Sequence, residues 1–153
     1  MSNQEIRDKY IRRLDSRLET LDKESNRVFC AYYNNLISFI LNKNKPENLV
    51  YLTYSRLKKI SCEEVPDENF KLFLGLMIDE RVNVLLEKFE AHDFENEDST
   101  LIDFEEITNC IINEKFINPF TGCEISSKEY WAMITTFFCL SDELVGDLYA
   151  RSC

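Results

Sequence analysis

The sequence has few of the residues on which several fold and site classes depend. It contains only three Gly and three Pro in 153 residues. All-β sandwiches and barrels need many tight turns, in which these two residues are preferred. The chain also has no glycine-rich phosphate loop and no serine nucleophile motif. These absences favour long helices with few connections, and they argue against the common nucleotide-binding and hydrolase classes.

Potential metal ligands are also scarce. His92 is the only histidine, and the closest pair of the six cysteines, Cys110 and Cys123, lies thirteen residues apart, too far for a zinc-type spacing. The acids after His92 do not form a calcium loop, because Asp98 and Phe104 stand where an EF-hand requires Gly and Glu. We therefore predict no metal, no cofactor and no catalytic residue, and thus a protein that is not an enzyme.

No apolar run approaches the roughly 18 residues that a membrane-spanning helix requires. The first residues, Met1–Glu5, are polar and lead into no apolar segment of the secretory type. We therefore expect a cytoplasmic protein with no membrane contact and with free thiols. Cys30, Cys110 and Cys139 lie among apolar neighbours and are expected in the core, whereas Cys153 is expected to be exposed.

Hydrophobic residues make up 44% of the chain, which suffices for one core in a domain of ordinary size. We predict a single domain over residues 1–153, an all-α bundle of five to seven helices. The Asn118-Pro119 and Thr121-Gly122 pairs indicate a turn. This turn is compatible with a small β-hairpin near 116–125.

Apolar residues at spacings of three and four predict the N-terminal helices. The first covers residues 4–23 and either continues to about residue 43 or breaks at the polar stretch Asp22–Asn26. Residues 48–60 favour another helix, although Val50–Tyr54 is rich in strand-forming residues.

The strongest helical pattern covers residues 67–91. Apolar residues on its other faces, Leu72, Leu76 and Val84, predict a helix that is packed on several sides. An acidic loop at 92–100 should follow, and then a helix at about 101–115 that carries Ile107, Ile111 and Ile112.

Capping residues predict the last helices. Ser126, with Glu129 three residues later, forms a capping box that opens a helix expected to include Ile134, Phe137 and Phe138. Ser141 and Asp142 start a final short helix.

Charge is unevenly distributed along the chain. Residues 1–60 carry 12 basic and 7 acidic side chains, a net charge of +5, whereas residues 61–153 carry 6 basic and 21 acidic ones, a net of −15. The whole chain has a net charge of −10. Because non-specific nucleic-acid binding requires positive charge, direct binding of DNA or RNA is not expected of the chain as a whole.

Residues 93–106 hold seven carboxylates, with aromatic and aliphatic side chains between them. One interpretation is a solvated loop and helix start, since acids favour a helix N-terminus. The other is a docking surface, on which carboxylates steer a basic partner and aromatic side chains anchor it. The residues of this predicted docking surface are Asp93, Phe94, Glu95, Glu97, Asp98, Asp103, Phe104, Glu105 and Glu106.

We favour the hypothesis of a small acidic inhibitor of the immunity or anti-defence type. It would neutralise a toxin or another basic protein, such as a nuclease or a nucleic-acid-binding protein, by covering its basic cleft. The alternative is a small nucleic-acid-binding regulator that uses the basic residues between Arg7 and Arg17. Acids interleave with these residues, so pairing within the chain is a competing interpretation. An enzyme built on scattered carboxylates is a third hypothesis, for which the sequence singles out no pair.

Overall fold

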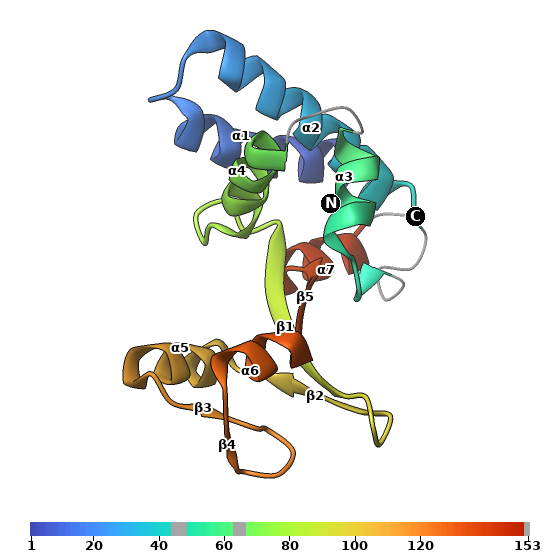
Figure 1. Cartoon of the computed structure of the whole chain (residues 1–153). Coiled ribbons are helices and arrows are strands. Elements are labelled where there is room, and N and C mark those ends of the chain that lie inside the picture. Colours follow the sequence, from blue (N-terminus) through green and yellow to red (C-terminus); the bar gives the residue numbers. More distant parts are fainter. Residues whose placement is uncertain (44–48, 63–66, 152–153) are drawn as a thin grey trace. The chain divides into compact units, whose positions relative to one another are not determined.

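The computed structural model describes residues 1–43, 49–62 and 67–151 (Figure 1). They form seven helices, a three-stranded sheet and a two-stranded sheet, with 57% helix and 18% strand. The chain divides into two compact units. Unit 1 comprises Met1–Leu86 and Phe138–Cys153, and unit 2 comprises Glu87–Phe137. The prediction of an all-α fold is therefore wrong, because it lacked the three-stranded sheet.

Two helices, α1 (Asn3–Leu18) and α2 (Lys23–Leu41), form the N-terminal part of unit 1. The side chain of Asp22 accepts a hydrogen bond from the backbone N–H of Ser25 at 2.7 Å and so caps the start of α2. Of the two alternatives for residues 4–43, the break near Asp22 is confirmed.

Helix α3 (Tyr54–Ser61) begins after Thr53, whose hydroxyl accepts from the backbone N–H of Arg56 at 3.2 Å. Just before it, Leu52 forms an isolated antiparallel bridge with Phe138, with backbone hydrogen bonds of 2.7 and 2.8 Å. The segment 48–60 is thus helical in its second half, and of the strand-forming residues ahead of the helix Leu52 forms a β-bridge. Asn48, like Cys153, lies outside the described residues.

Helix α4 (Asp67–Ile78) is shorter than the predicted helix at 67–91, and that prediction is wrong after Ile78. Asp79 accepts a hydrogen bond from the backbone N–H of Arg81 at 2.9 Å, which forms a turn. Asn83 then has a φ of 60°, in the left-handed region that a right-handed helix excludes. The chain continues as strand β1 (Leu85–Asp93).

Strand β1 lies in the middle of the three-stranded sheet, in the order β2-β1-β5, between β2 (Asp98–Ile102) and β5 (Ile134–Leu140). β1 and β2 pair antiparallel, from Phe89 opposite Ile102 to Asp93 opposite Asp98. The predicted acidic loop at 92–100 is therefore wrong, because most of it belongs to this hairpin. Only the four residues between the strands form the connection.

Helix α5 (Phe104–Asn113) follows β2 and lies within the range predicted for it, 101–115. Strands β3 (Phe116–Ile117) and β4 (Glu124–Ile125) pair antiparallel and confirm the hairpin near 116–125. At the turn, the side-chain oxygen of Asn118 accepts from the backbone N–H of Phe120 at 2.8 Å.

Helix α6 (Ser127–Met133) begins as predicted, because the Ser126 hydroxyl accepts from the backbone N–H of Glu129 at 3.1 Å. The prediction that this helix includes Ile134, Phe137 and Phe138 is wrong, since those residues belong to β5. β-Branched and aromatic residues predominate in this segment and suit a pleated strand. Helix α7 (Asp142–Tyr149) confirms the start expected at Ser141.

Each unit has its own core. The core of unit 1 is large and includes the fully buried side chains of Tyr10, Leu14 and Leu18 from α1. The core of unit 2 is small, with Ala91, Ile102 and Ile107 at its centre and Phe89, Phe120 and Ile134 packed against it. Because this core is small, several large hydrophobic side chains of unit 2 remain exposed.

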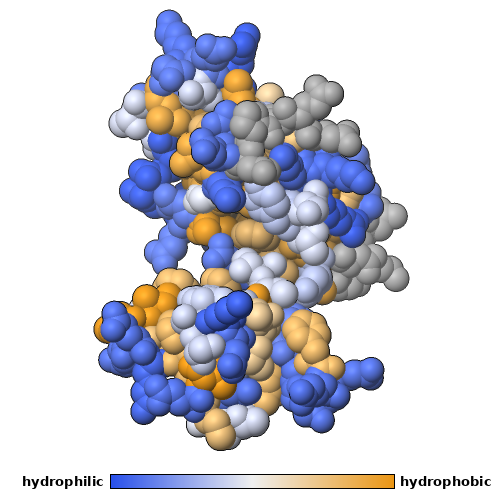
Figure 2. Space-filling model, viewed as in Figure 1, coloured by the Kyte–Doolittle hydropathy of each residue, from blue (hydrophilic) through white to orange (hydrophobic). Residues whose placement is uncertain are grey.

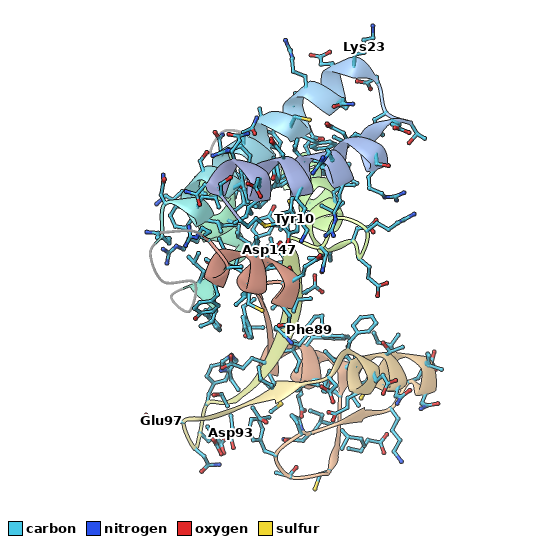
Figure 3. The ribbon with its side chains drawn as sticks, turned by 180° about the vertical axis from the view of Figure 1, so that it is seen from behind. Tyr10, Lys23, Phe89, Asp93, Glu97 and Asp147 are labelled. Carbon is cyan, nitrogen blue, oxygen red and sulfur yellow. The ribbon has the colours of Figure 1, made fainter. Side chains whose placement is uncertain are left out.

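Helix α1 is joined to α7 by a polar contact inside unit 1 (Figure 3). The hydroxyl of Tyr10 and the ammonium group of Lys9 both donate to the carboxylate of Asp147, each at 2.7 Å. Burial and the hydrogen bond to Asp147 raise the pKa of Tyr10 far above its ordinary value. The phenol therefore remains a hydrogen-bond donor throughout the physiological range.

A second contact lies one turn further along α1 and one turn earlier along α7. The guanidinium group of Arg13 donates to both carboxylate oxygens of Glu143, at 2.7 and 2.8 Å. The amide group of Asn83 donates to the same carboxylate at 3.1 Å. The hydrogen bond from Arg13 is the main cause that holds the pKa of Glu143 well below its ordinary value.

We expect Glu143→Gln to lower the free energy of unfolding at about pH 7 by about 1 kcal/mol, as for a partly exposed pair. Because the pKa of Glu143 is depressed in the folded chain, its stabilisation is complete above the unfolded pKa of about 4.3. The stabilisation is lost as pH falls below that value toward the folded pKa. The difference from the wild type should therefore shrink between about pH 7 and about pH 3, as measured by urea unfolding with circular dichroism.

Asp142→Asn is the matched control, because Asp142 is exposed in the same first turn of α7 and takes part in no ion pair among the described residues. Its effect should be less than half that of Glu143→Gln. A difference between Glu143→Gln and the wild type that stayed constant with pH would contradict the expected ionic contribution.

Candidate functional site

The nine residues of the predicted docking surface all lie in unit 2. Five of them, Asp93, Phe94, Glu95, Glu97 and Asp98, lie at the end of the β1–β2 hairpin, where Figure 3 shows Asp93 and Glu97 at the tip. The other four, from Asp103 to Glu106, form the start of α5, directly after β2. Strand β2 thus carries the chain from one acidic group to the other within a single unit.

The division into units also separates charge, but along a different boundary from the division by sequence position. Residues 87–137 carry twelve acidic and three basic side chains, a net charge of −9. The remaining residues carry sixteen acidic and fifteen basic ones, a net charge of −1. Nearly all of the net negative charge of the protein therefore belongs to unit 2.

At the hairpin tip, Asp93 has a structural task. Its carboxylate accepts from the backbone N–H groups of Glu95 and Asn96, at 3.2 and 3.3 Å, and from the side-chain amide of Asn96 at 2.8 Å. The hydrogen bond from the Asn96 side chain is the main cause that lowers the pKa of Asp93. The side chains of Glu95 and Glu97 take part in no ion pair among the described residues, so their charges remain available to a partner.

His92 belongs to strand β1, so the prediction that it lies in a loop is wrong. Its Nε2 lies 2.8 Å from the hydroxyl of Thr135, and its Nδ1 lies 3.7 Å from a carboxylate oxygen of Glu90. The order carboxylate, imidazole, hydroxyl is that of a hydrolytic triad. However, 3.7 Å is too long for the hydrogen bond that orients a catalytic imidazole. The geometry therefore gives no support for nucleophilic catalysis by Thr135.

Beside His92 lies a cavity of about 510 Å³ at the hairpin end. The ring of Phe94 stacks on His92, with centroids 5.7 Å apart and planes 23° apart, while its side chain remains 75% exposed. Carboxylates form most of the lining, which consists of Glu90, His92, Asp93, Phe94, Glu97, Asp98 and Ser99. Carboxylates beside an aromatic ring suit the ammonium or guanidinium group of a Lys or Arg side chain.

Exposed apolar side chains accompany the acids of α5. Phe104 is 68% exposed and stacks on Phe89 at a centroid distance of 6.1 Å. Ile111 and Ile112, seven and eight residues further on, are also exposed, as is Leu101 on β2. Figure 2 shows hydrophobic atoms at the surface among hydrophilic ones over the region that α5 occupies in Figure 1. These residues extend the docking surface predicted from the sequence.

The sequence reasoning included Phe94 and Phe104 but omitted Leu101, Ile111 and Ile112 from the surface. The sequence does contain a signal for the two isoleucines, because Phe104, Ile111 and Ile112 occupy positions i, i+7 and i+8, which share one side of a helix. However, isoleucines in an amphipathic helix ordinarily face the core, so this pattern by itself does not place them at the surface. Here only Ile107 of α5 is buried.

The basic side chains of α1, proposed above as a nucleic-acid surface, are largely paired within unit 1. Lys9 and Arg13 bind Asp147 and Glu143, as described, and Arg17 lies 3.1 Å from Asp79. Hydrogen bonds from Arg81, together with the charges of Arg81 and Arg17, lower the pKa of Asp79 to about 2. This pairing agrees with the interpretation of α1 as an internally paired helix.

Among the described residues, no group of three or more His, Cys, Asp or Glu side chains is placed to hold a metal ion. The described cysteines form no disulfide with one another, and burial is the main cause that raises the pKa of Cys30 to about 11. In the same part of the chain, no helix has the length and apolar character needed to cross a membrane.

Comparisons with known proteins add nothing to this picture, since no family model, no curated protein and no solved structure matches the chain. We therefore infer a function from the geometry and charge of the molecule itself.

The hairpin tip permits a test of its backbone geometry. Glu97 has a φ of 51°, in the left-handed region, where Gly is favoured over residues with a Cβ atom. We therefore expect Glu97→Gly to raise the free energy of unfolding by about 0.5 to 1 kcal/mol. Urea unfolding followed by the fluorescence of Trp131, the only tryptophan and part of unit 2, would measure this.

Glu95→Gly is the control, because it removes the same charge from the same connection at a residue without a left-handed φ. It should leave stability unchanged or lower it. Equal shifts in the two variants would mean that charge, and not backbone geometry, determines the effect.

Proposed function

We propose that the protein is a small cytoplasmic binding protein that inhibits a basic partner protein through unit 2. The observation that carries this proposal is the concentration of a net charge of −9 in a unit of 51 residues whose surface also exposes Phe94, Leu101 and Phe104. Acidic surfaces that face only water are common. Aromatic and aliphatic side chains exposed among the acids are instead typical of a protein–protein interface.

The two kinds of side chain have different tasks in such an interface. Carboxylates attract a basic surface over about one Debye length, roughly 10 Å at 0.1 M salt, and so raise the rate of association. Phe94 and Phe104 provide the apolar contact that slows dissociation. The cavity beside His92 accepts a Lys or Arg side chain of the partner, which the carboxylates of Glu90, Glu97 and Asp98 neutralise.

Inhibition follows from the class of protein that such a surface fits. Nucleases and nucleic-acid-binding proteins present basic clefts to phosphate groups. An acidic unit with apolar anchors covers such a cleft and excludes the nucleic acid by competition. Neutralisation of a toxin or of a defence nuclease, as by an immunity or anti-defence protein, is the biological form of this activity. It requires no catalytic residue and no cofactor.

The alternative, a regulator that binds nucleic acid through α1, has less support. Lys9, Arg13 and Arg17 each contact a carboxylate of unit 1. A phosphate backbone would have to displace these carboxylates before it gained any contact.

The partner can be captured with the tagged protein from a lysate of its source organism and identified by mass spectrometry. Raising the salt from about 0.1 M to about 1 M shortens the Debye length from about 10 Å to about 3 Å and should release a partner held by charge. Retention of one stoichiometric basic protein that salt releases supports the proposal. Retention of nucleic acid supports the alternative.

Charge reversal then tests where the partner binds. Replacing Glu97, Asp98, Glu105 and Glu106 by Lys leaves unit 2 with a net charge of about −1. We expect the association rate of the captured partner, measured by surface plasmon resonance, to fall at least tenfold, with little change in unfolding temperature.

The matched control carries the same change in total charge outside unit 2. Four exposed acids of unit 1, two of them in the first turns of helices, are replaced by Lys: Glu19, Glu68, Glu80 and Asp142. This variant should bind at close to the wild-type rate. If both variants bind equally well, or both lose binding equally, unit 2 is not the docking surface.

A further inference from the structure

Helix α4 has an apolar side that unit 1 does not cover. Phe70, Phe73 and Met77 face the core and are completely buried. On the other side of the helix, Leu72 is 63% exposed, and Leu76 is only partly buried. Apolar side chains of a helix normally pack against another element, yet Leu72 is left largely exposed to solvent.

The uncovered side of α4 forms one wall of a groove within unit 1. The cavity measures about 760 Å³, and its second wall is the end of α1 and the start of α2. Leu21, which is 43% exposed, and the partly buried Val28 provide the apolar part of that wall. The groove is therefore apolar on both walls, and its most exposed apolar side chain is Leu72.

Gly75 lies in the groove, within α4. A Cβ atom added there would meet no atom within 4 Å, and the residue has no left-handed φ. Glycine weakens the interior of a helix relative to alanine, and no contact among the described residues requires it at this position. Its absence of a side chain does, however, allow a second helix to approach the backbone of α4 closely.

The charged residues of the two walls are complementary. Lys71 lies on the α4 wall, whereas Glu24 lies on the α2 wall. Among the described residues neither takes part in an ion pair, whereas Arg17 in the same lining is paired with Asp79. A two-fold axis that runs along the groove places each wall of one copy against the other wall of the second. Such a pairing brings Lys71 of each copy to Glu24 of the other.

Net charge also favours a second copy as the occupant. Unit 1 has a net charge of −1, so two copies approach through it with little repulsion, whereas two copies of unit 2, at −9 each, repel. We propose that the protein self-associates into a two-fold dimer through the α4 groove. Leu72 of each copy enters the groove of the other, and the two α4 helices cross near Gly75.

Analytical ultracentrifugation of the full chain over a concentration series up to about 0.2 mM tests this. The wild type should shift from 18.1 kDa toward twice that mass as concentration rises. Leu72→Glu should remain a monomer and keep its unfolding temperature, since Leu72 is mostly exposed. Leu101→Glu is the matched control, with the same substitution at a residue of unit 2 that is 67% exposed, and it should dimerise like the wild type.

Two further variant sets identify the partner surface. Lys71→Glu and Glu24→Lys should each weaken the dimer about tenfold, and the double variant should restore it, because the exchanged charges meet across the two-fold axis. Gly75→Ala should raise the unfolding temperature, since alanine favours the helix, while it weakens the dimer. Opposite effects on stability and on association distinguish a crossing site from a folding defect.

A wild type that remains monomeric at the highest concentration overturns the proposal, as does a dimer that survives Leu72→Glu. A monomer that retains a small apolar molecule in native mass spectrometry also overturns it and assigns the groove to a ligand. The result is independent of the proposed inhibition, because every substitution except the Leu101 control lies outside unit 2.

Discussion

The contact between α1 and α7 is the constraint on which unit 1 depends, because this unit is made from two separate stretches of the chain. Arg13 and Tyr10 come from the first stretch, and Glu143 and Asp147 come from the second, after residues 87–137 have formed unit 2. The returning strand is fixed in the same way, since Ser141 donates its hydroxyl hydrogen to the backbone carbonyl of Asn83 at 2.6 Å. The free-energy cost of closing such a loop grows only slowly with its length. Once α1 and α7 are in contact, the cost of closing the chain therefore depends little on the length of the segment that forms unit 2.

The same ion pairs also account for part of the difference in net charge between the two units. Unit 1 uses its cations internally, because Lys9, Arg13 and Arg17 are bound by carboxylates of the same unit, and its net charge is close to zero. Unit 2 has few cations with which to pair its acids, and its small core leaves several large apolar side chains at the surface. Water hydrates the carboxylates of this surface well, whereas its exposed apolar side chains gain free energy when a partner buries them. Unit 1 thus uses its charge structurally, whereas the proposed binding function belongs to unit 2.

Local signals in the sequence predicted local features well. Ser126, Ser141 and Asp22 cap helices because their side chains bond backbone groups only three residues away, and no distant contact is needed. The strands were missed for the opposite reason. Residues 82–89 satisfy helical spacing, and only Asn83 in the left-handed region and the partner strands β2 and β5 make β1 a strand. The predicted acidic residues lie in one unit because they are close in sequence. The division into units depends on the return of the chain at Phe138 and could not be predicted from local pattern.

The two surfaces proposed here constrain each other through charge. Exposed Phe104, Ile111 and Ile112 would promote association between copies if unit 2 were neutral, but its net charge of −9 opposes that contact. The same charge attracts a basic partner, so one electrostatic feature suppresses the wrong contact and favours the intended one. Self-association is then left to the nearly neutral unit 1, where Leu72 and Gly75 offer an apolar groove. A dimer formed there carries two acidic units. A partner that is itself dimeric would meet both at a high effective concentration, provided that the geometry allows the two contacts together.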